Sequence, residues 1–578
     1  MQVGLLSRER PIFGVPTPLP EAEGNMRQRA IASVVATLRG RGTCSCMESS
    51  CRELGDLTVS FGSDGARRTQ QEPRSGNLPM NEREKSDGVV VPMKQPNKDV
   101  ARCTSAEAVE GRSPTKGNAV KPDTHRTQSR NQRVPTGLAS VRQAAAKDRK
   151  AKFTALLHHV TVDRLRDAFK ALKRRASPGI DGKTWGEYAE ALESNLADLH
   201  ARVHRGSYRA KPTRRTYIPK PDGRMRPLGI AALEDKIVQR AVGEVLHAIY
   251  EVDFLGFSYG FRRGRSQHDA LDALAVALER KKVNWVLDAD IRGYFDAIDH
   301  EWMMRFVEHR IGDPRVLRLI RKWLNAGVVE DGRWRASAEG TPQGATMSPL
   351  LANVFLHYAF DQWAHQWRKR HARGDVVIVR YADDFVVGFQ RRDDAVRFQR
   401  ALRGRLERFK LELHPDKTRL LEFGRYAHER RGRRGEGKPE TFDFLGFTHV
   451  CGRDRFGRYQ VLRKTSRKRM TAKLHVVKAD VMFRRHRPIP EQGKWLGSVV
   501  RGYFAYHAIP NNTRRMNSFR ERILRMWLHA LRRRSQRSHV TWQRMNRLAA
   551  RWIPTVTVQH PWPGDRFDAK TRGRSPVR

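Results

Sequence analysis

Two adjacent carboxylates stand between two strongly apolar, β-branched runs at residues 375–389, which read DVVIVRYADDFVVGF. The runs predict two strands, and the residues from Tyr381 to Asp384 predict the tight turn between them. Burying two neighbouring carboxylates beside an apolar hairpin is costly. A bound divalent cation would offset that cost, because hard cations prefer oxygen ligands. The hairpin is therefore either part of a metal site or a solvated acidic turn, and this stretch alone leaves both readings open.

A second apolar strand, over residues 283–287, also runs into carboxylates, at Asp288 and Asp290. If this strand neighbours the hairpin in one sheet, Asp290 converges with Asp383 and Asp384. Three converging carboxylates form the kind of site that holds two Mg²⁺ ions about 3.5–4 Å apart in phosphoryl-transfer enzymes. Asp296 and Asp299 fall in a helix expected over 294–311, and we assign them structural roles.

The charge of the chain points to a polyanionic partner. Lys and Arg number 112 against 62 Asp and Glu, for a formal net charge of +50. Such an excess favours binding through phosphate contacts but does not distinguish RNA from DNA, and a purely structural RNA-binding protein would show the same balance. Residues 501–550 hold 12 Arg, no Lys and one acid, and the aromatic residues among them are expected mostly in the core. The arginines expected to bind RNA are Arg514, Arg515, Arg532, Arg533 and Arg534.

Cysteine usage and hydropathy favour a cytoplasmic protein. Cys44, Cys46 and Cys51 lie close together, but no second Cys or His pair follows at the spacing of a zinc finger. The cysteines form no disulfide framework, which makes a reducing compartment the expectation. No apolar run approaches the length of a membrane span, and the N-terminus does not have the pattern of a signal peptide.

A basic hairpin is expected ahead of the acidic one. Residues 208–230 predict two strands joined by a Pro-Asp-Gly turn, with Lys220 and Arg226 near the bend. Two cations at a hairpin tip suit a triphosphate, although a basic surface hairpin is the alternative. Residues 1–145 lack sustained periodicity and are expected to be a largely disordered basic extension. From about residue 455 the pattern predicts helices.

Taken in order, these stretches resemble the ordered sequence blocks of bacterial group II intron-encoded reverse transcriptases, which are also called maturases. The resemblance covers roughly 175–450, and GYFAYH at 502–507 extends it into the family's maturase, or thumb, region. The matching blocks are SPGIDG (177–182), IPK with RPLG (218–220 and 226–229), FSYGF (257–261), DIRGYFD with IDH (290–296 and 298–300), TPQG with SPLLAN (341–344 and 348–353), YADD (381–384), HPDKT (414–418) and FLGF (444–447).

The resemblance implies an α+β fold of the right-hand polymerase type. Fingers and a palm with an antiparallel sheet would occupy 146–450. An α-helical thumb, or maturase, domain that binds RNA would occupy 451–545. The residues that follow, 546–578, predict an irregular basic tail by their own pattern.

The resemblance also implies roles for individual residues. Metal would be held by Asp290, Asp383 and Asp384 with help from the Ile291 carbonyl. Phe295 would lie beside the sugar and exclude a 2′-hydroxyl group. The residues implied to bind the nucleotide are Lys220, Arg226, Phe295, Gln343, Gly344 and Lys417. The activity would be RNA-directed DNA synthesis with two Mg²⁺ ions and deoxynucleoside triphosphates. The partners would be group II intron RNA, an RNA template with a DNA primer, and target DNA, and a homodimer is left open.

Departures from the family pattern leave alternatives. No Cys follows Cys451, whereas the family's endonuclease needs Cys pairs, so we expect an endonuclease-lacking member that takes its primer from elsewhere, such as a replication fork. Arg263 stands where the family usually has Pro. One alternative is a domesticated bacterial reverse transcriptase of the defence or diversity-generating type. Another is an RNA-binding splicing cofactor with a dispensable polymerase, against which the intact set of aspartates and Phe295 argue.

Overall fold

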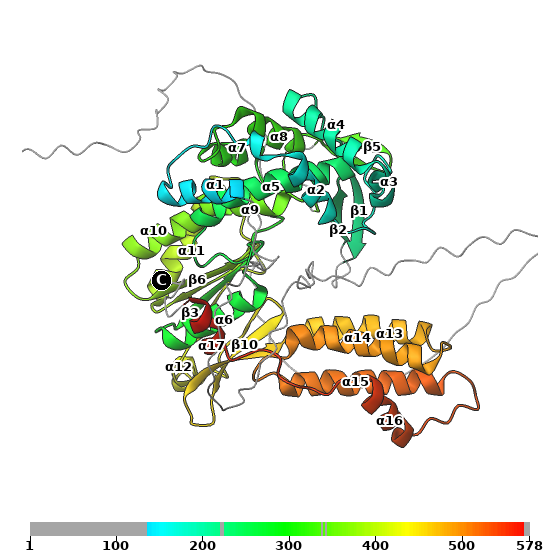
Figure 1. Cartoon of the computed structure of the whole chain (residues 1–578). Coiled ribbons are helices and arrows are strands. Elements are labelled where there is room, and N and C mark those ends of the chain that lie inside the picture. Colours follow the sequence, from blue (N-terminus) through cyan, green and yellow to red (C-terminus); the bar gives the residue numbers. More distant parts are fainter. Residues whose placement is uncertain (1–135, 220–224, 337–338, 342–343, 572–578) are drawn as a thin grey trace, which may run out of the picture. The chain divides into compact units, whose positions relative to one another are not determined.

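The computed structural model describes residues 136–219, 225–336, 339–341 and 344–571 (Figure 1). They form a mixed α/β structure with three β-sheets. Most of the predicted N-terminal extension lies outside the described residues. Within the described part, no helix is long and apolar enough to cross a membrane.

The central sheet has the strand order β6-β7-β3-β8 and is antiparallel throughout. Tyr381 pairs with Asp384, which leaves Ala382 and Asp383 as a two-residue turn and confirms the predicted acidic hairpin. Ala289 pairs with Phe385, so the chain leaves β3 toward Asp290 beside that turn. The prediction that these strands are neighbours is therefore confirmed. The strands are β3 (Trp285–Ala289), β6 (Val376–Tyr381), β7 (Asp384–Phe389) and β8 (Arg419–Glu422).

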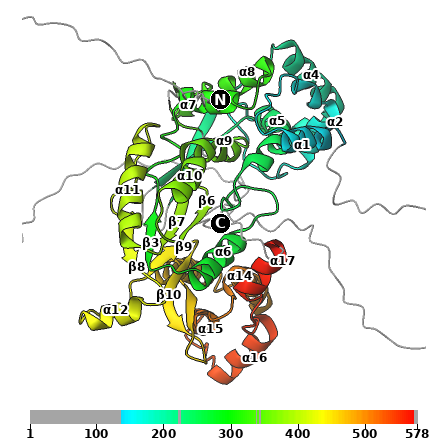
Figure 2. The same cartoon turned by 90° about the vertical axis from the view of Figure 1, so that its left-hand side faces the viewer.

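Both faces of the central sheet are buried, which explains why its strands read as continuous apolar runs rather than alternating ones. Val377, Val379 and Val386 pack with helix α6 (Gln267–Arg280). Ile378 and Val387 join the large core on the opposite face, where helices α10 and α11 lie (Figure 2). The helices of that face are α9 (Ser348–Leu356), the π-helical turn η2 (His357–Asp361), α10 (Gln362–Arg370) and α11 (Arg392–Glu407).

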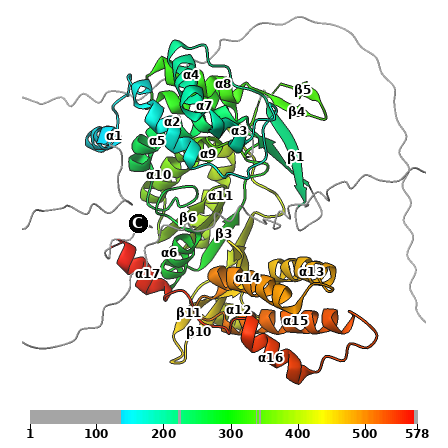
Figure 3. The same ribbon diagram turned by 45° about the vertical axis from the view of Figure 1, so that its right-hand side comes forward.

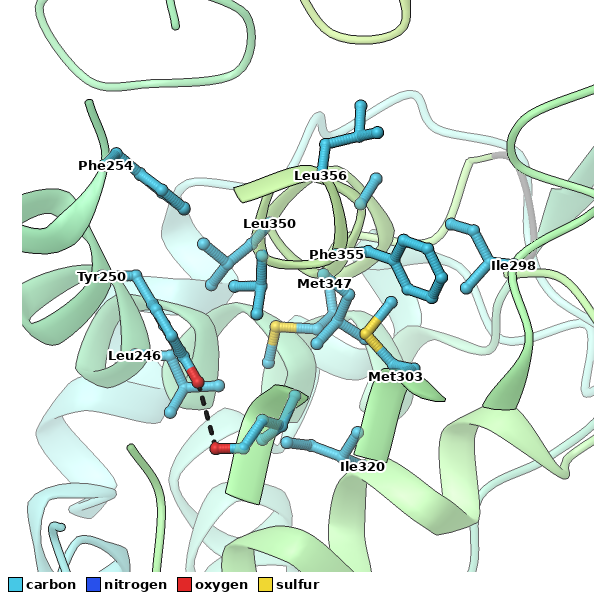
Figure 4. Close-up of a cluster of buried hydrophobic side chains, with 14 of the residues drawn as sticks. Leu246, Tyr250, Phe254, Ile298, Met303, Ile320, Met347, Leu350, Phe355 and Leu356 are labelled. Atoms are coloured by element: carbon cyan, nitrogen blue, oxygen red, sulfur yellow. Dashed lines mark hydrogen bonds between the residues drawn. The ribbon is translucent and has the colours of Figure 1, made fainter. Parts of the chain in front are cut away.

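The large core continues into a group of helices around α5. Tyr250 of α5 is fully buried and donates a hydrogen bond to the Val307 carbonyl at 3.2 Å, among side chains such as Met303, Leu350 and Phe355 (Figure 4). The elements of this group are α1 (Thr136–Lys147), η1 (Leu157–His159), α2 (Val162–Lys170), α3 (Trp185–Glu190), α4 (Leu192–Arg205), α5 (Leu233–Asp253), α7 (His300–Glu308) and α8 (Pro314–Leu324).

The second sheet contains the basic hairpin. Strands β1 (Thr213–Pro219) and β2 (Met225–Ile230) pair antiparallel, which confirms the predicted pair of strands, and their register sets Ile218 opposite Arg226. The turn between them lies outside the described residues. Strand β4 (Val328–Glu330) adds to β1 in parallel, and β5 (Arg333–Arg335) completes the sheet.

The third sheet corrects the prediction of helices from about residue 455. Strands β9 (Phe442–Phe444), β10 (Phe447–Arg453) and β11 (Tyr459–Thr465) form an antiparallel sheet that follows the short helix α12 (Ala427–Arg433). The buried positions of β11 alternate, at Val461, Arg463 and Thr465. One of the three is Arg463, which pairs with buried Asp272 at 2.5 Å. The buried face of β11 therefore does not read as alternating apolar residues in the sequence.

The predicted basic helices follow this sheet. Helices α13 (Arg467–Phe483), α14 (Ile489–His507), α15 (Thr513–Arg532) and α16 (Trp542–Trp552) lie side by side (Figures 1 and 3). Their core contains Phe504, Phe519 and Trp527, as expected of the aromatic residues, whereas Trp542 is exposed. Helix α16 approaches α14 at Gly493, where an added Cβ would lie 2.4 Å from the ring of Trp552.

Two further predictions are wrong. The expected irregular tail contains helix α17 (Pro563–Thr571), which buries Phe567 in the core shared with α6. Ion pairs join Arg280 to Asp568 and Asp269 to Lys570 across the two helices, and composition alone does not reveal them. The helix expected from residue 294 begins only at His300, because the Asp299 side chain caps it by accepting a hydrogen bond from the Trp302 N–H at 2.9 Å.

Candidate active site

Three carboxylates lie at one edge of the central sheet. Asp290 follows β3, Asp383 occupies the hairpin turn, and Asp384 begins β7. Asp384 is exposed to solvent, yet the protein around it still displaces much of its water. This desolvation and the negative charges of Asp383 and Asp290 raise the pKa of Asp384 well above its ordinary value. The three side chains therefore interact electrostatically, as expected for residues at the ends of two neighbouring strands.

Two cations face this cluster. Desolvation and the charge of Asp290 raise the pKa of Asp383, while the charges of Arg226 and Lys417 act in the opposite direction. The Lys417 ammonium group also forms an ion pair with the Asp290 carboxylate. The loop that carries Lys417 is anchored nearby, because the His414 N–H donates to the Asp290 carbonyl at 2.8 Å. The sheet of the basic hairpin and the loop after residue 413 thus both deliver positive charge to the acidic edge.

The donor chemistry of this edge fits a hard divalent cation. The available ligands are carboxylate oxygens, and their mutual repulsion is relieved here only in part, by an ammonium and a guanidinium group. As the side chains stand, no group of three or more His, Cys, Asp or Glu residues in the described part of the chain is arranged to hold a metal ion.

The acidic turn is held in an unusual conformation. Ala382 has a φ of +58°, at the first position of a two-residue turn where glycine is the usual residue. The backbone of Gly260 packs directly against it, and an added Cβ there would lie 2.3 Å from the Ala382 nitrogen. The segment before Gly260 runs along the end of β6, because Tyr259 donates to the Arg380 carbonyl and Arg380 donates to the Phe257 carbonyl, both at 2.9 Å. The FSYGF block therefore forms one wall of the turn.

The remaining predicted residues of this region lie on segments that meet one another. Phe295 is partly buried, contacts Phe261 edge to face at 6.4 Å between ring centroids, and accepts a hydrogen bond from the Thr341 N–H at 2.8 Å. Gly344 has a φ of +113°, and an added Cβ there would lie 2.8 Å from the Gly229 carbonyl of β2. Ile291 is buried. Lys220 and Gln343 lie outside the described residues.

The predicted RNA-binding arginines lie on or beside α15. Arg514 and Arg533 are exposed, and Arg515 is partly exposed. Arg532 donates from Nε to the Val540 carbonyl at 2.9 Å, and Arg534 donates to the His486 carbonyl at 3.3 Å. These last two arginines therefore also tie down neighbouring loops.

Two features of the site were missed at the sequence level. The charge of Arg469, in the first turn of α13, opposes the rise in the pKa of Asp384, and no local pattern marks that residue among so many arginines. Arg380 is fully buried and pairs with the equally buried Asp361. The alternation of Val376, Ile378 and Arg380 along β6 does place Arg380 on the core-facing side, and this signal was available.

The sequence matches a known protein family and several known proteins. Residues 218–449 match the family described as "Reverse transcriptase (RNA-dependent DNA polymerase)". Protein YkfC of Escherichia coli (strain K12) is 35% identical over 319 residues, which cover 50% of this chain and 79% of that protein.

Intron-encoded relatives match over shorter stretches. The group II intron-encoded protein LtrA of Lactococcus lactis subsp. cremoris is 42% identical over 166 residues, covering 28% of this chain and 27% of LtrA. Nuclear intron maturase 4, mitochondrial, of Arabidopsis thaliana is 25% identical over 228 residues, covering 38% of this chain and 27% of that protein. The matched regions thus span 27% of the length of these two relatives. The chain belongs to the reverse transcriptase (RNA-dependent DNA polymerase) family, and its relatives include group II intron-encoded members.

Proposed function

We propose that this protein is an RNA-directed DNA polymerase that copies a group II intron RNA and that also binds this RNA to promote splicing and mobility. The observation that carries the polymerase proposal is the meeting of Asp290, Asp383 and Asp384 at one edge of an antiparallel sheet, with Arg226 and Lys417 facing them. Membership of the reverse transcriptase family supports the same conclusion.

We assign the parts of a right-hand polymerase to the observed elements as follows. The sheet β6-β7-β3-β8 and its helices form the palm, and the sheet β2-β1-β4-β5 belongs to the fingers, within 146–450. Helices α13 to α16 form the thumb, or maturase, domain predicted over 451–545, and α16 extends it to Trp552. The hairpin of β10 and β11 spans the boundary at 450 and connects palm and thumb.

We assign separate roles in nucleotide addition to the residues of the site. Arg226 and Lys417, with Lys220, bind the triphosphate, and Phe295 lies beside the sugar and selects against a 2′-hydroxyl group. Gln343 and Gly344 line the nucleotide pocket. When bound by Asp290, Asp383, Asp384 and the Ile291 carbonyl, two Mg²⁺ ions would supply charge neutralisation for the primer 3′-hydroxyl and for the leaving pyrophosphate.

The basic helices supply the RNA-binding role. Their exposed arginines, which include Arg514 and Arg533, lie opposite a core of apolar and aromatic side chains. Such a face binds phosphates without reading sequence. The partners we propose are therefore intron RNA, the RNA template with its DNA primer, and target DNA.

A double variant, Asp383→Asn with Asp384→Asn, tests the division of roles. We expect loss of cDNA synthesis from an RNA template with Mg²⁺ and deoxynucleotides, because two of the proposed metal ligands lose their charge. Binding of intron RNA and stimulation of its splicing should persist, because the basic helices are unchanged. A folded double variant that loses splicing as completely as it loses synthesis would contradict the separation of roles. Wild-type protein that stimulates splicing but makes no cDNA would favour the splicing-cofactor alternative.

A further inference from the structure

A buried arginine stands one residue before the acidic turn. Arg380 has no solvent exposure, and all of its guanidinium nitrogens find partners. Nε and Nη2 donate to the two oxygens of Asp361 at 2.7 and 2.5 Å, and Asp361 is itself fully buried. Nη2 also donates to the Ser258 hydroxyl at 2.8 Å, and Nη1 donates to the Asn353 side-chain oxygen at 3.1 Å. We call Arg380, Asp361, Asn353 and Ser258 the turn clamp.

The clamp contacts the backbone on both sides of the strained turn. Arg380 Nη1 donates to the Ala382 carbonyl at 2.9 Å. Asn353 Nδ2 donates to the carbonyl of Gly260 at 2.6 Å, and Gly260 is the residue whose backbone packs on Ala382. One buried cluster therefore fixes both the left-handed Ala382 and the segment against which it rests.

A local irregularity in the helices places the Asp361 side chain within reach of Arg380. Residues His357–Asp361 form a π-helical turn between α9 and α10, in which the Gln362 N–H donates to the His357 carbonyl. A π-helical turn shifts the register of the side chains that follow it, and such turns are frequent at functional sites. Asn353 precedes this turn on α9 and Asp361 ends it, so the altered register lets both side chains reach one guanidinium group.

A fully buried ion pair is weak evidence of a contribution to stability, since well-packed apolar residues of similar size often replace such pairs without loss. What apolar residues cannot replace is a fork of donors that contacts a carboxylate, an amide and a turn carbonyl at once. This difference favours a role in geometry over a role in stability.

We infer that the turn clamp is a positioning device that sets the direction of Asp383 and Asp384 by holding Ala382 in its left-handed conformation. The inference rests on the proposed function, in which those two aspartates hold the metal. None of the four clamp residues touches the nucleotide in this assignment. They act through the backbone of the turn.

A second buried pair provides a matched control. Arg310 and Asp253 are also buried and pair at 2.9 Å. Arg310 donates to the carbonyls of Asp148 and Ala151 rather than to the acidic turn. If burial of an ion pair is all that matters, Asp361→Asn and Asp253→Asn should behave alike. If the clamp positions the turn, only Asp361→Asn should change the chemistry of the folded enzyme.

The test is primer extension on an RNA template by the full chain, with thermal unfolding measured in parallel. For Asp361→Asn we expect kcat to fall by about tenfold or more and the Mg²⁺ concentration at half-maximal rate to rise, with the KM for deoxynucleotide little changed. For Asp253→Asn we expect a lower melting temperature with wild-type kcat and Mg²⁺ dependence. Ser258→Ala removes one partner of Arg380, and Asn353→Ala removes another together with the hydrogen bond to the Gly260 carbonyl. Both variants should shift the same two quantities in the same direction, and they keep the proposal testable if Asp361→Asn does not fold.

The inference is overturned if folded clamp variants keep wild-type kcat and Mg²⁺ dependence, or if Asp253→Asn changes both to the same extent. If the wild type is active and the clamp variants have the same kcat and Mg²⁺ dependence, this inference alone is refuted. A wild type that does not extend a primer with Mg²⁺ and deoxynucleotides would refute the proposed function, and the inference with it.

Discussion

Replacing Gly260 with alanine should separate the acidic turn from the segment that supports it. The new Cβ would lie 2.3 Å from the Ala382 nitrogen and 3.0 Å from both the Ala382 Cα and the Tyr381 carbonyl carbon. Non-bonded heavy atoms rest about 3.5–4.0 Å apart, so the two backbones must move apart by roughly 1 Å. Overpacking of this kind typically costs about 1–3 kcal/mol of unfolding free energy. A displacement of about 1 Å at catalytic groups can cost about 10²-fold in rate.

The matched control is Gly404→Ala in helix α11, where an added Cβ meets nothing within 4 Å. Alanine in a helix interior is favoured over glycine by about 0.5–1 kcal/mol, so this variant should be slightly more stable and fully active. Urea unfolding and primer extension on an RNA template measure the two quantities. If Gly260→Ala protein unfolds in the expected range but extends primers at the wild-type rate, the turn does not depend on this contact and the reasoning fails.

Three further predictions concern other parts of the molecule. Phe295→Ala should raise incorporation of ribonucleotides relative to deoxynucleotides by about tenfold or more, because the proposed barrier to a 2′-hydroxyl group is removed; an unchanged ratio in competition assays would remove Phe295 from that role. Burial, with a smaller effect from Arg463, lowers the pKa of His449 to about 3. In the unfolded chain histidine titrates near 6.5, so as the pH falls His449 is protonated in the unfolded chain before it is protonated in the folded one. The residue should therefore reduce the unfolding free energy by about 1.4 kcal/mol for each pH unit below 6.5. His449→Phe, which keeps the stacked contact with Phe442, should flatten that acid slope in urea unfolding between pH 6.5 and 4, and an equal slope would contradict the assignment. Phe567→Ala should lower the unfolding free energy by up to about 5 kcal/mol and make α17 accessible to proteases before the rest of the chain. Uniform digestion kinetics would show that α17 does not depend on this contact.

The central hairpin and its third carboxylate were predictable because local signals agree there. Apolar runs, a two-residue turn and a second strand ending at Asp290 all indicate one sheet edge, and β6, β7 and β3 have the expected pairing. The basic hairpin of β1 and β2 was predictable for the same reason, since its turn chemistry and its flanking strands are local.

The features that were missed depend on pairing across long separations in sequence. The role of Asp361 follows from neither composition nor periodicity, because its position depends on a π-helical turn and on a partner, Arg380, in strand β6. Strand β11 was hidden by Arg463, whose partner Asp272 lies in α6. The docking of α17 likewise depends on charges in α6. Each of these is a buried or bridging charge, whose energy depends on a partner that a local pattern does not identify.

The docking of α17 on α6 also has a consequence for synthesis of the chain. Arg280 meets Asp568 across 288 positions, and Asp269 meets Lys570 across 301 positions. At about 5–20 residues per second on the ribosome, α6 therefore waits roughly 15–60 s for the helix that covers it. During that interval the apolar surface that will receive Phe567 and the acidic side chains around it stay uncovered. A nascent chain stalled before residue 563 would carry the whole central sheet with this face of α6 still open.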